Sequence, residues 1–142
     1  MDKSTLPMSP TLKAALLADA VVSGGVAAQQ LALTAPLAEL TLLPAALLSG
    51  TGLFMVGYTA LLLALWRAPR VLPWLIRFIV AGNIGWALAC LYLLAGQVVP
   101  FSAWGEALLL VQAAGVLVLA GWEGLGLRRC GEARPGLRAA AA

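Results

Sequence analysis

The feature that most constrains this chain is a set of four apolar stretches, each close to the length that crosses a lipid bilayer. They cover about residues 12–34, 44–66, 74–94 and 103–127. A transmembrane helix needs about 20 apolar residues to cross roughly 30 Å of hydrocarbon. Prolines occur in all three connecting segments, where a missing backbone N–H does no harm. We therefore expect an all-α fold, an integral membrane four-helix bundle.

The balance of apolar and charged residues supports lipid as the solvent. The chain is 62% hydrophobic and 11% charged, whereas a soluble domain carries about 25% charged residues. A soluble chain of 142 residues would not bury so much apolar surface, because small domains bury only part of theirs. The net charge of +3 does not indicate nucleic acid as a partner, since the basic residues flank the apolar stretches.

The basic residues also predict how the chain sits in the membrane. They occur before the first stretch, around the middle connection and after the fourth stretch: Lys3, Lys13, Arg67, Arg70, Arg77, Arg128, Arg129, Arg134 and Arg138. The only charged residues in and beside the first and third connections are Glu39 and, just inside the fourth stretch, Glu106. By the positive-inside rule, both termini and the middle connection are cytoplasmic, in an up-down-up-down bundle. Tryptophans mark the expected boundaries, as in an aromatic belt: Trp66, Trp74, Trp104 and Trp122.

The sequence divides into three parts. Residues 1–11 are expected to form an N-terminal tail, residues 12–127 the bundle, and residues 128–142 a basic, disordered C-terminal tail. Asp19 interrupts the apolar core of the first stretch, which favours a retained span over a cleaved signal peptide. We expect a multi-pass protein of the bacterial inner (cytoplasmic) membrane.

Polar residues inside the apolar stretches define a candidate intramembrane site, because such groups usually face the bundle interior or a cavity. In the first stretch Asp19, Ser23 and Gln30 fall within a stripe of ~40° on one helix face. Similar spacing aligns polar residues on each of the other three stretches. The candidate site residues are Asp19, Ser23, Tyr58, Asn83, Trp86, Gln112 and Glu123.

Depth along each helix suggests which of these residues meet. At 1.5 Å per residue, Asp19 lies ~10 Å from the cytoplasmic end, Tyr58 ~12 Å and Glu123 ~6 Å. We expect Asp19 to face the interior with Tyr58 or Glu123 as its nearest polar partner, either as a functional carboxyl or as a structural tie. For Glu123, snorkelling to the cytoplasmic surface beside Arg128 is favoured, and Arg77 is expected to be a snorkelling anchor.

The amides and glycines have structural interpretations. Asn83 and Gln112 are expected to form interhelical hydrogen bonds, each worth ~0.6 kcal/mol on average. Glycines let membrane helices approach closely, and we expect Gly52 and Gly85 to lie at helix contacts.

Several kinds of chemistry lack support in the sequence. The chain has no histidine, which removes the commonest general base and the usual nitrogen ligand of zinc and haem. Cys90 and Cys130 fall at different expected depths, so an intramolecular disulfide is not expected. No nucleophile–base pair stands out, so we predict a protein that is not an enzyme and has no cofactor or bound metal.

Four segments carry a resemblance to an uncharacterised family of small four-span bacterial inner-membrane proteins. They are residues 17–24 (LADAVVSG), 44–48 (PAALL), 82–86 (GNIGW) and 124–129 (GLGLRR). The resemblance covers most of residues 10–129 and implies the four-span fold, but no activity. In size and number of spans, the chain is more loosely similar to DoxX-like membrane proteins, some of which are subunits of quinone-linked oxidoreductases.

Three classes of function remain open at this point. The leading hypothesis is a non-enzymatic accessory or scaffold subunit, or a small ligand-binding bundle. The second is a small oligomeric transporter in which Asp19 is the coupling carboxyl. The third is a membrane subunit of a quinone-linked oxidoreductase. The expected partners are membrane lipid, other membrane subunits or a second copy of the chain, and no nucleic acid.

Overall fold

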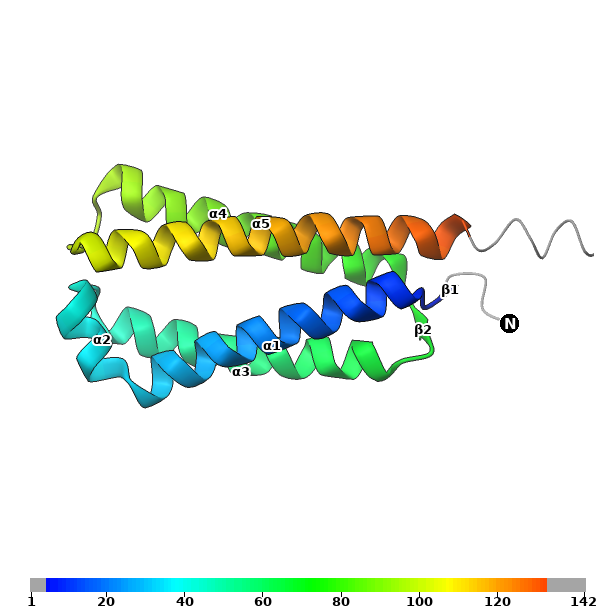
Figure 1. Cartoon of the computed structure of the whole chain (residues 1–142), viewed down its shortest axis with the longest axis horizontal. Helices are drawn as coiled ribbons and strands as arrows, with labels where there is room; N and C mark the ends of the chain where they lie inside the picture. Colours follow the sequence, from blue (N-terminus) through cyan, green and yellow to red (C-terminus); the bar gives the residue numbers. More distant parts are fainter. Residues whose placement is uncertain (1–4, 133–142) are drawn as a thin grey trace, which may run out of the picture.

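Helices account for most of residues 5–132, the part of the chain that the computed structural model describes (Figure 1). They are α1 (Pro10–Ala32), α2 (Thr34–Thr41), α3 (Ala45–Arg67), α4 (Pro73–Gly96) and α5 (Ala103–Glu132). Four of them, all except α2, are long and apolar enough to span a membrane. The predicted all-α fold with four long apolar helices is therefore confirmed.

The four long helices pack unequally. α1 packs along α3 and along α5, and α4 packs along α5. In Figure 1, α4 and α5 run side by side above α1 and α3. α3 and α4 are not among the closely packed pairs, so the space between them is bridged by side chains.

The end of the bundle where the chain begins is tied together by the N-terminal segment. Strand β1 (Leu6–Pro7) pairs antiparallel with β2 (Arg70–Val71). Ser9 then caps α1: its hydroxyl accepts from the Leu12 N–H at 3.1 Å and donates to the Gly126 carbonyl at 2.9 Å. The tail expected over residues 1–11 is thus a paired strand and a helix cap where it is described.

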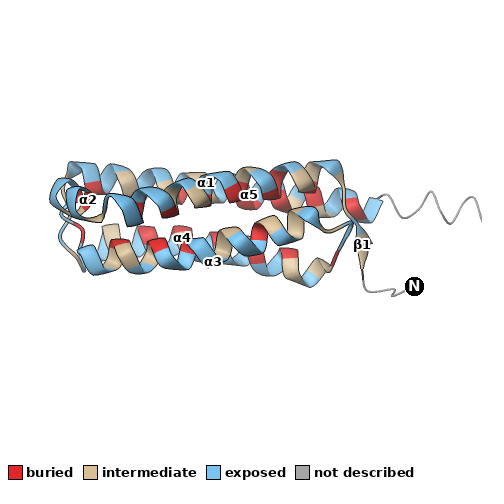
Figure 2. Cartoon of the chain, turned by 90° about the horizontal axis from the view of Figure 1, so that it is seen from below, coloured by how far each residue is buried: buried red, intermediate tan, exposed pale blue. Residues whose placement is uncertain are grey.

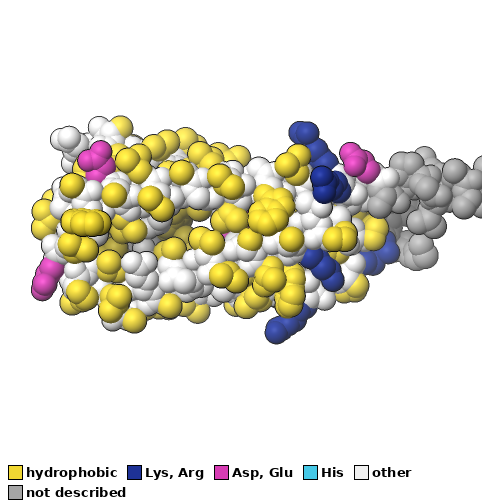
Figure 3. All heavy atoms as spheres, viewed as in Figure 1, with side chains coloured by type: hydrophobic (Ala, Val, Ile, Leu, Met, Phe, Trp, Pro, Cys, Tyr) yellow, Lys and Arg dark blue, Asp and Glu magenta, His cyan; other side chains and the backbone are white. Residues whose placement is uncertain are grey.

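We call this end of the bundle the basic end. In Figure 3 the Lys and Arg side chains in view gather there. α5 continues to Glu132, past the expected boundary at residue 127, and Arg129 donates to the Thr11 hydroxyl at 2.8 Å. The rest of the expected C-terminal tail, residues 133–142, lies outside the described residues.

At the opposite end, the first connection contains a helix where a loop was expected. Pro36 lies in the first turn of α2. Backbone N–H groups in a first turn have no partner within the helix, so the N–H that proline lacks is not needed there. Leu42 ends the helix in the left-handed region, with φ of 60°. The Thr41 carbonyl accepts from the Ser102 N–H at 2.8 Å, which ties α2 to the segment before α5.

The interior contains two apolar clusters with polar residues between them. The cluster at the basic end includes Leu16, Leu62 and Ile76, and the other includes Leu48 and Leu109. Figure 2 shows the buried residues along the inner faces of the helices. Large apolar side chains also cover the outside, as Figure 3 shows, which is the surface that a lipid environment favours.

Of the two glycines expected at helix contacts, one lies at a contact and the other does not. Gly52 lies at a helix contact as expected, because a Cβ there would lie 3.0 Å from the Leu31 side chain. Gly85 does not: it is exposed, and a Cβ there would meet nothing within 4 Å. The closest approaches occur at Gly105 and Gly126, where a Cβ would lie 2.5 Å and 2.7 Å from backbone atoms of other helices.

Candidate functional site

The Asp19 carboxylate is the centre of a buried hydrogen-bond network. Its side chain is 0% exposed. Oδ1 accepts from the Ser23 hydroxyl at 2.8 Å, one turn along α1. Oδ2 accepts from the Tyr58 hydroxyl of α3 at 2.7 Å and from the Asn83 Nδ2 of α4 at 3.1 Å. One side chain therefore links three helices, and Tyr58, one of its two expected partners, donates to it.

Glu123 brings the fourth long helix into this network. Its Oε2 accepts from Asn83 Nδ2 at 3.2 Å, and the side chain is 0% exposed. The snorkelling interpretation of Glu123 is therefore wrong. Its face of α5 is held against α1 by the close approach of Gly126 to Leu12, which turns the carboxyl inward.

Asn83 joins the two carboxyl groups through one amide nitrogen. The two hydrogens of Nδ2 are matched by Asp19 Oδ2 and Glu123 Oε2. Its Oδ1 lies 3.2 Å from the Tyr58 hydroxyl. Within residues 5–132, every group that donates to the two carboxyls is neutral, and Glu123 Oε1 is buried and accepts from none of them. The site therefore holds two buried acids that lie close enough to hydrogen-bond each other when one of them is protonated.

A cavity of about 310 Å³ lies between α3 and α4, beside this network. We call it the α3–α4 pocket. Its lining residues are Phe54, Met55, Gly57, Tyr58, Leu61, Phe78, Ile79, Gly82, Asn83 and Trp86. Phe54 lies between two stacked neighbours, with ring centroids 6.3 Å from Tyr58 and 6.0 Å from Trp86. The pocket thus has mainly apolar walls, and its Tyr58 and Asn83 connect directly to the buried acids.

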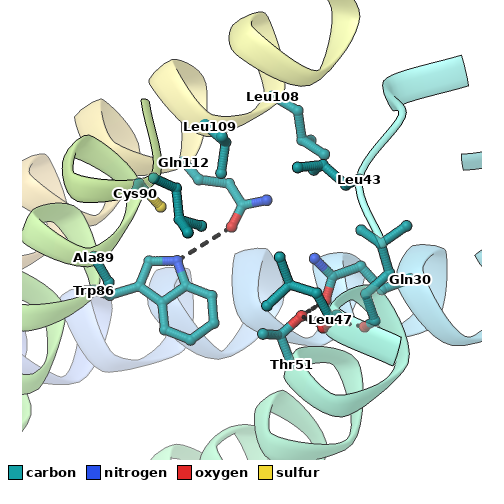
Figure 4. Close-up of a pocket in the computed structure, with 12 residues that line it drawn as sticks. Gln30, Leu43, Leu47, Thr51, Trp86, Ala89, Cys90, Leu108, Leu109 and Gln112 are labelled. Atoms are coloured by element: carbon teal, nitrogen blue, oxygen red, sulfur yellow. Dashed lines mark hydrogen bonds between the residues drawn. The ribbon is translucent and has the colours of Figure 1, made fainter. Parts of the chain in front are cut away.

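A second cavity, of about 120 Å³, lies nearer the opposite end, among α1, α3, α4 and α5 (Figure 4). We call it the glutamine pocket, after Gln30 and Gln112. The Trp86 Nε1–H donates to Gln112 Oε1 at 3.1 Å, and the Thr51 hydroxyl lies 3.0 Å from Gln30 Oε1. Trp86 lines both cavities.

The structure thus divides the predicted site residues into two groups. Five of them form the carboxyl network: Asp19, Ser23, Tyr58, Asn83 and Glu123. Trp86 and Gln112 form a separate hydrogen-bonded pair. Phe54 was not among the predicted site residues, although its i, i+4 spacing from Tyr58 places the two rings on one helix face.

Other predicted positions lie outside these networks. Arg77 is exposed on α4. Cys90 and Cys130 are free and buried. Among the described residues, no group of three or more His, Cys, Asp or Glu side chains is placed to hold a metal ion.

No protein-family model, curated protein or solved structure matches the chain.

Proposed function

We propose that the chain is a non-enzymatic, multi-pass protein of the bacterial inner membrane that binds a lipid-soluble ligand in the α3–α4 pocket. The observation that carries this proposal is the position of the pocket. It lies between two helices that do not pack closely, and its polar residues hydrogen-bond the buried carboxyls. A ligand that reaches the pocket from lipid would meet apolar walls first and hydrogen-bonding groups beyond them.

The membrane part of the proposal rests on the surface of the bundle. Four helices are long and apolar enough to span a bilayer, and many large apolar side chains point outward. The basic side chains in view gather at one end (Figure 3). We infer that this end is cytoplasmic, with both termini there and the spans in up-down-up-down order.

The pocket indicates the chemistry of the ligand. Its volume of about 310 Å³ is at the lower limit of the ~300–1,000 Å³ typical of small-molecule sites. Phe54 and Trp86 present flat aromatic surfaces, which suit a ring or an unsaturated chain. The hydrogens of Tyr58 and Asn83 go to the buried carboxyls, so these two residues would accept hydrogen bonds from a donor on a polar head. The proposed ligand is therefore amphipathic, with a head about the size of one ring.

Filling the pocket tests this proposal. Gly82 lines it, and a Cβ there would meet nothing within 4 Å, so Gly82→Phe adds a ring without a backbone clash. Gly121→Phe is the matched control, because Gly121 is also exposed and unobstructed but lies on α5 outside the pocket.

The measurement is organic extraction of protein purified from its native membrane, followed by mass spectrometry. We expect one lipid-soluble molecule to be enriched over bulk lipid in the parent and in Gly121→Phe, and lost in Gly82→Phe. Equal extracts from all three proteins would contradict the proposal. A quinone as the enriched molecule would favour the alternative of a subunit in a quinone-linked oxidoreductase.

A second candidate function, proton-coupled transport, is favoured by the pair of buried acids. Asp19 and Glu123 accept hydrogen bonds from the same nitrogen and have no basic partner among residues 5–132, and two neighbouring carboxylates repel strongly in a low dielectric. A single proton on the pair removes this repulsion. Proteoliposomes of the parent should then carry a proton flux that Asp19→Asn abolishes, and equal fluxes with and without the protein would reject this candidate.

A further inference from the structure

We propose that the glutamine pocket is a second binding site, for a compact, neutral molecule that carries a hydrogen-bond acceptor such as a carbonyl oxygen. This site is separate from the α3–α4 pocket, and the proposal does not depend on what that pocket binds. It rests on the shape of the cavity and on the hydrogen-bonding groups that the two glutamines leave free.

The cavity has the size of a small ring. Its volume of about 120 Å³ is slightly below the ~150 Å³ of an engineered cavity that binds benzene. Most of the wall is aliphatic, from Leu43, Leu47, Leu48, Leu93, Leu108 and Leu109. No charged side chain lines it. A charged ligand would lose its hydration there without a partner, so the occupant is neutral.

Gln112 presents a free hydrogen-bond donor to this cavity. The Trp86 indole nitrogen can only donate, so it fixes the orientation of the Gln112 amide with Oε1 toward the indole, at 3.1 Å. The amide nitrogen is therefore the atom left over, and no described residue accepts from it. Figure 4 shows this nitrogen pointing away from Trp86, into the space between the lining residues.

Gln30 also presents an unmatched polar atom, although it is only 5% exposed. Its Oε1 lies 3.0 Å from the Thr51 hydroxyl, which lies 2.8 Å from the Leu47 carbonyl as well. The single hydroxyl hydrogen can serve only one of these acceptors. If the hydroxyl donates to Gln30 Oε1, the amide nitrogen of Gln30 has no partner. If the hydroxyl donates to the Leu47 carbonyl, the Gln30 amide turns over so that its nitrogen donates to Thr51, and its oxygen has no partner. Either way, one polar atom of the Gln30 amide remains without a hydrogen-bond partner among the described residues.

These features together define the ligand class. The aliphatic wall requires a hydrocarbon body, and Gln112 Nε2 requires an acceptor on that body. Gln30 accommodates either a second acceptor or a donor. A cyclic ketone of six or seven heavy atoms satisfies the volume and the obligatory hydrogen bond. Water would pair with the amides but would leave the aliphatic wall uncovered, which costs free energy in proportion to that area.

The test compares cyclohexanone with methylenecyclohexane, which has the same shape but no acceptor. The reporter is the nitrogen–hydrogen resonance of the Trp86 indole in isotope-labelled protein in nanodiscs, assigned with Trp86→Phe. We expect a saturable shift with cyclohexanone and binding of the alkene about tenfold weaker, the ratio that one hydrogen bond supplies. In Gln112→Leu, assayed by ligand-observed transfer of magnetisation, this preference should disappear.

A filling variant keeps the proposal testable even where Gln112→Leu fails to fold. Ala89 lines the cavity and is exposed, so Ala89→Phe blocks it from the α4 side; Ala81→Phe, at an exposed α4 position outside both cavities, is the control. Binding should be lost in the first variant and kept in the second. Absence of a saturable shift in the parent, equal affinity for the two probes, or binding that survives Ala89→Phe would each overturn the proposal.

Discussion

Replacing Asp19 with leucine measures how much the buried carboxyl contributes to holding the helices together. The substitution removes the acceptor of three hydrogen bonds, from Ser23, Tyr58 and Asn83, at 2.7 to 3.1 Å. Hydrogen bonds between membrane helices average ~0.6 kcal/mol each, so the loss of the two from Tyr58 and Asn83 costs about 1 kcal/mol, and the loss of the bond from Ser23, within α1, adds to it. The expected total lies within the ~1–3 kcal/mol expected for a stranded buried polar group.

Two compensations keep the expected loss from being larger. Asn83 retains Glu123 as an acceptor, and Tyr58 retains the Asn83 carbonyl oxygen at 3.2 Å. Asp19→Asn should lower the free energy of unfolding by less, under about 1 kcal/mol. Its amide oxygen can accept from Tyr58 and Asn83, and its amide nitrogen can donate to the Ser23 hydroxyl, which also accepts.

The assay is reversible unfolding in mixed micelles, followed by circular dichroism. Gln29→Leu is the control, because Gln29 is an exposed polar residue on the same helix and its loss should leave the free energy of unfolding unchanged. A leucine variant as stable as the parent, together with rapid reaction of Asp19 with a water-soluble carbodiimide, would refute the buried network.

Three further predictions concern topology and packing. Reporter fusions at the C-terminus and within residues 97–102 should report opposite sides of the membrane, and a periplasmic signal from the C-terminal fusion would overturn the inferred orientation. Gly52→Leu should lower the melting temperature in detergent, because its Cβ would lie 3.0 Å from an α1 side chain, whereas Gly85→Leu should leave it unchanged; the reverse order would show that the helix contacts are assigned to the wrong faces. Gly126→Ala should destabilise by about 1–3 kcal/mol through overpacking, since its Cβ would lie 2.7 Å from the Leu12 Cα, and an unaltered unfolding curve would contradict that close approach.

The sequence predicted the long helices and Tyr58 as one of two candidate partners of Asp19, because both depend on properties that run along one helix. Length and hydropathy define each span, and a rise of 1.5 Å per residue places Asp19 and Tyr58 at similar depth. The stripe containing Asp19 and Ser23 follows from helical periodicity alone. Predicting these features does not require knowing which helices are neighbours.

The incorrect predictions concern which face of a helix meets which neighbour. Glu123 was expected to snorkel, because a residue near a span end can reach water, but the contact of Gly126 with Leu12 turns its face inward. Gly85 was expected at a contact, but it lies on the exposed side of α4. The α3–α4 pocket depends on two helices that do not pack closely. The periodicity of residues within α3 or within α4 does not indicate how far apart the two helices lie.

The position of Trp86 would couple the proposed occupants of the two cavities. Its indole forms part of both linings, stacks on Phe54 on one side and donates to Gln112 on the other. A molecule that displaces the ring in one cavity therefore alters the volume of the other and releases the Gln112 oxygen as an additional acceptor. Linkage requires the effect to be reciprocal, so each occupant changes the affinity for the other by the same factor. Heterotropic cooperativity in this small bundle would thus depend on the rotamer of a single side chain.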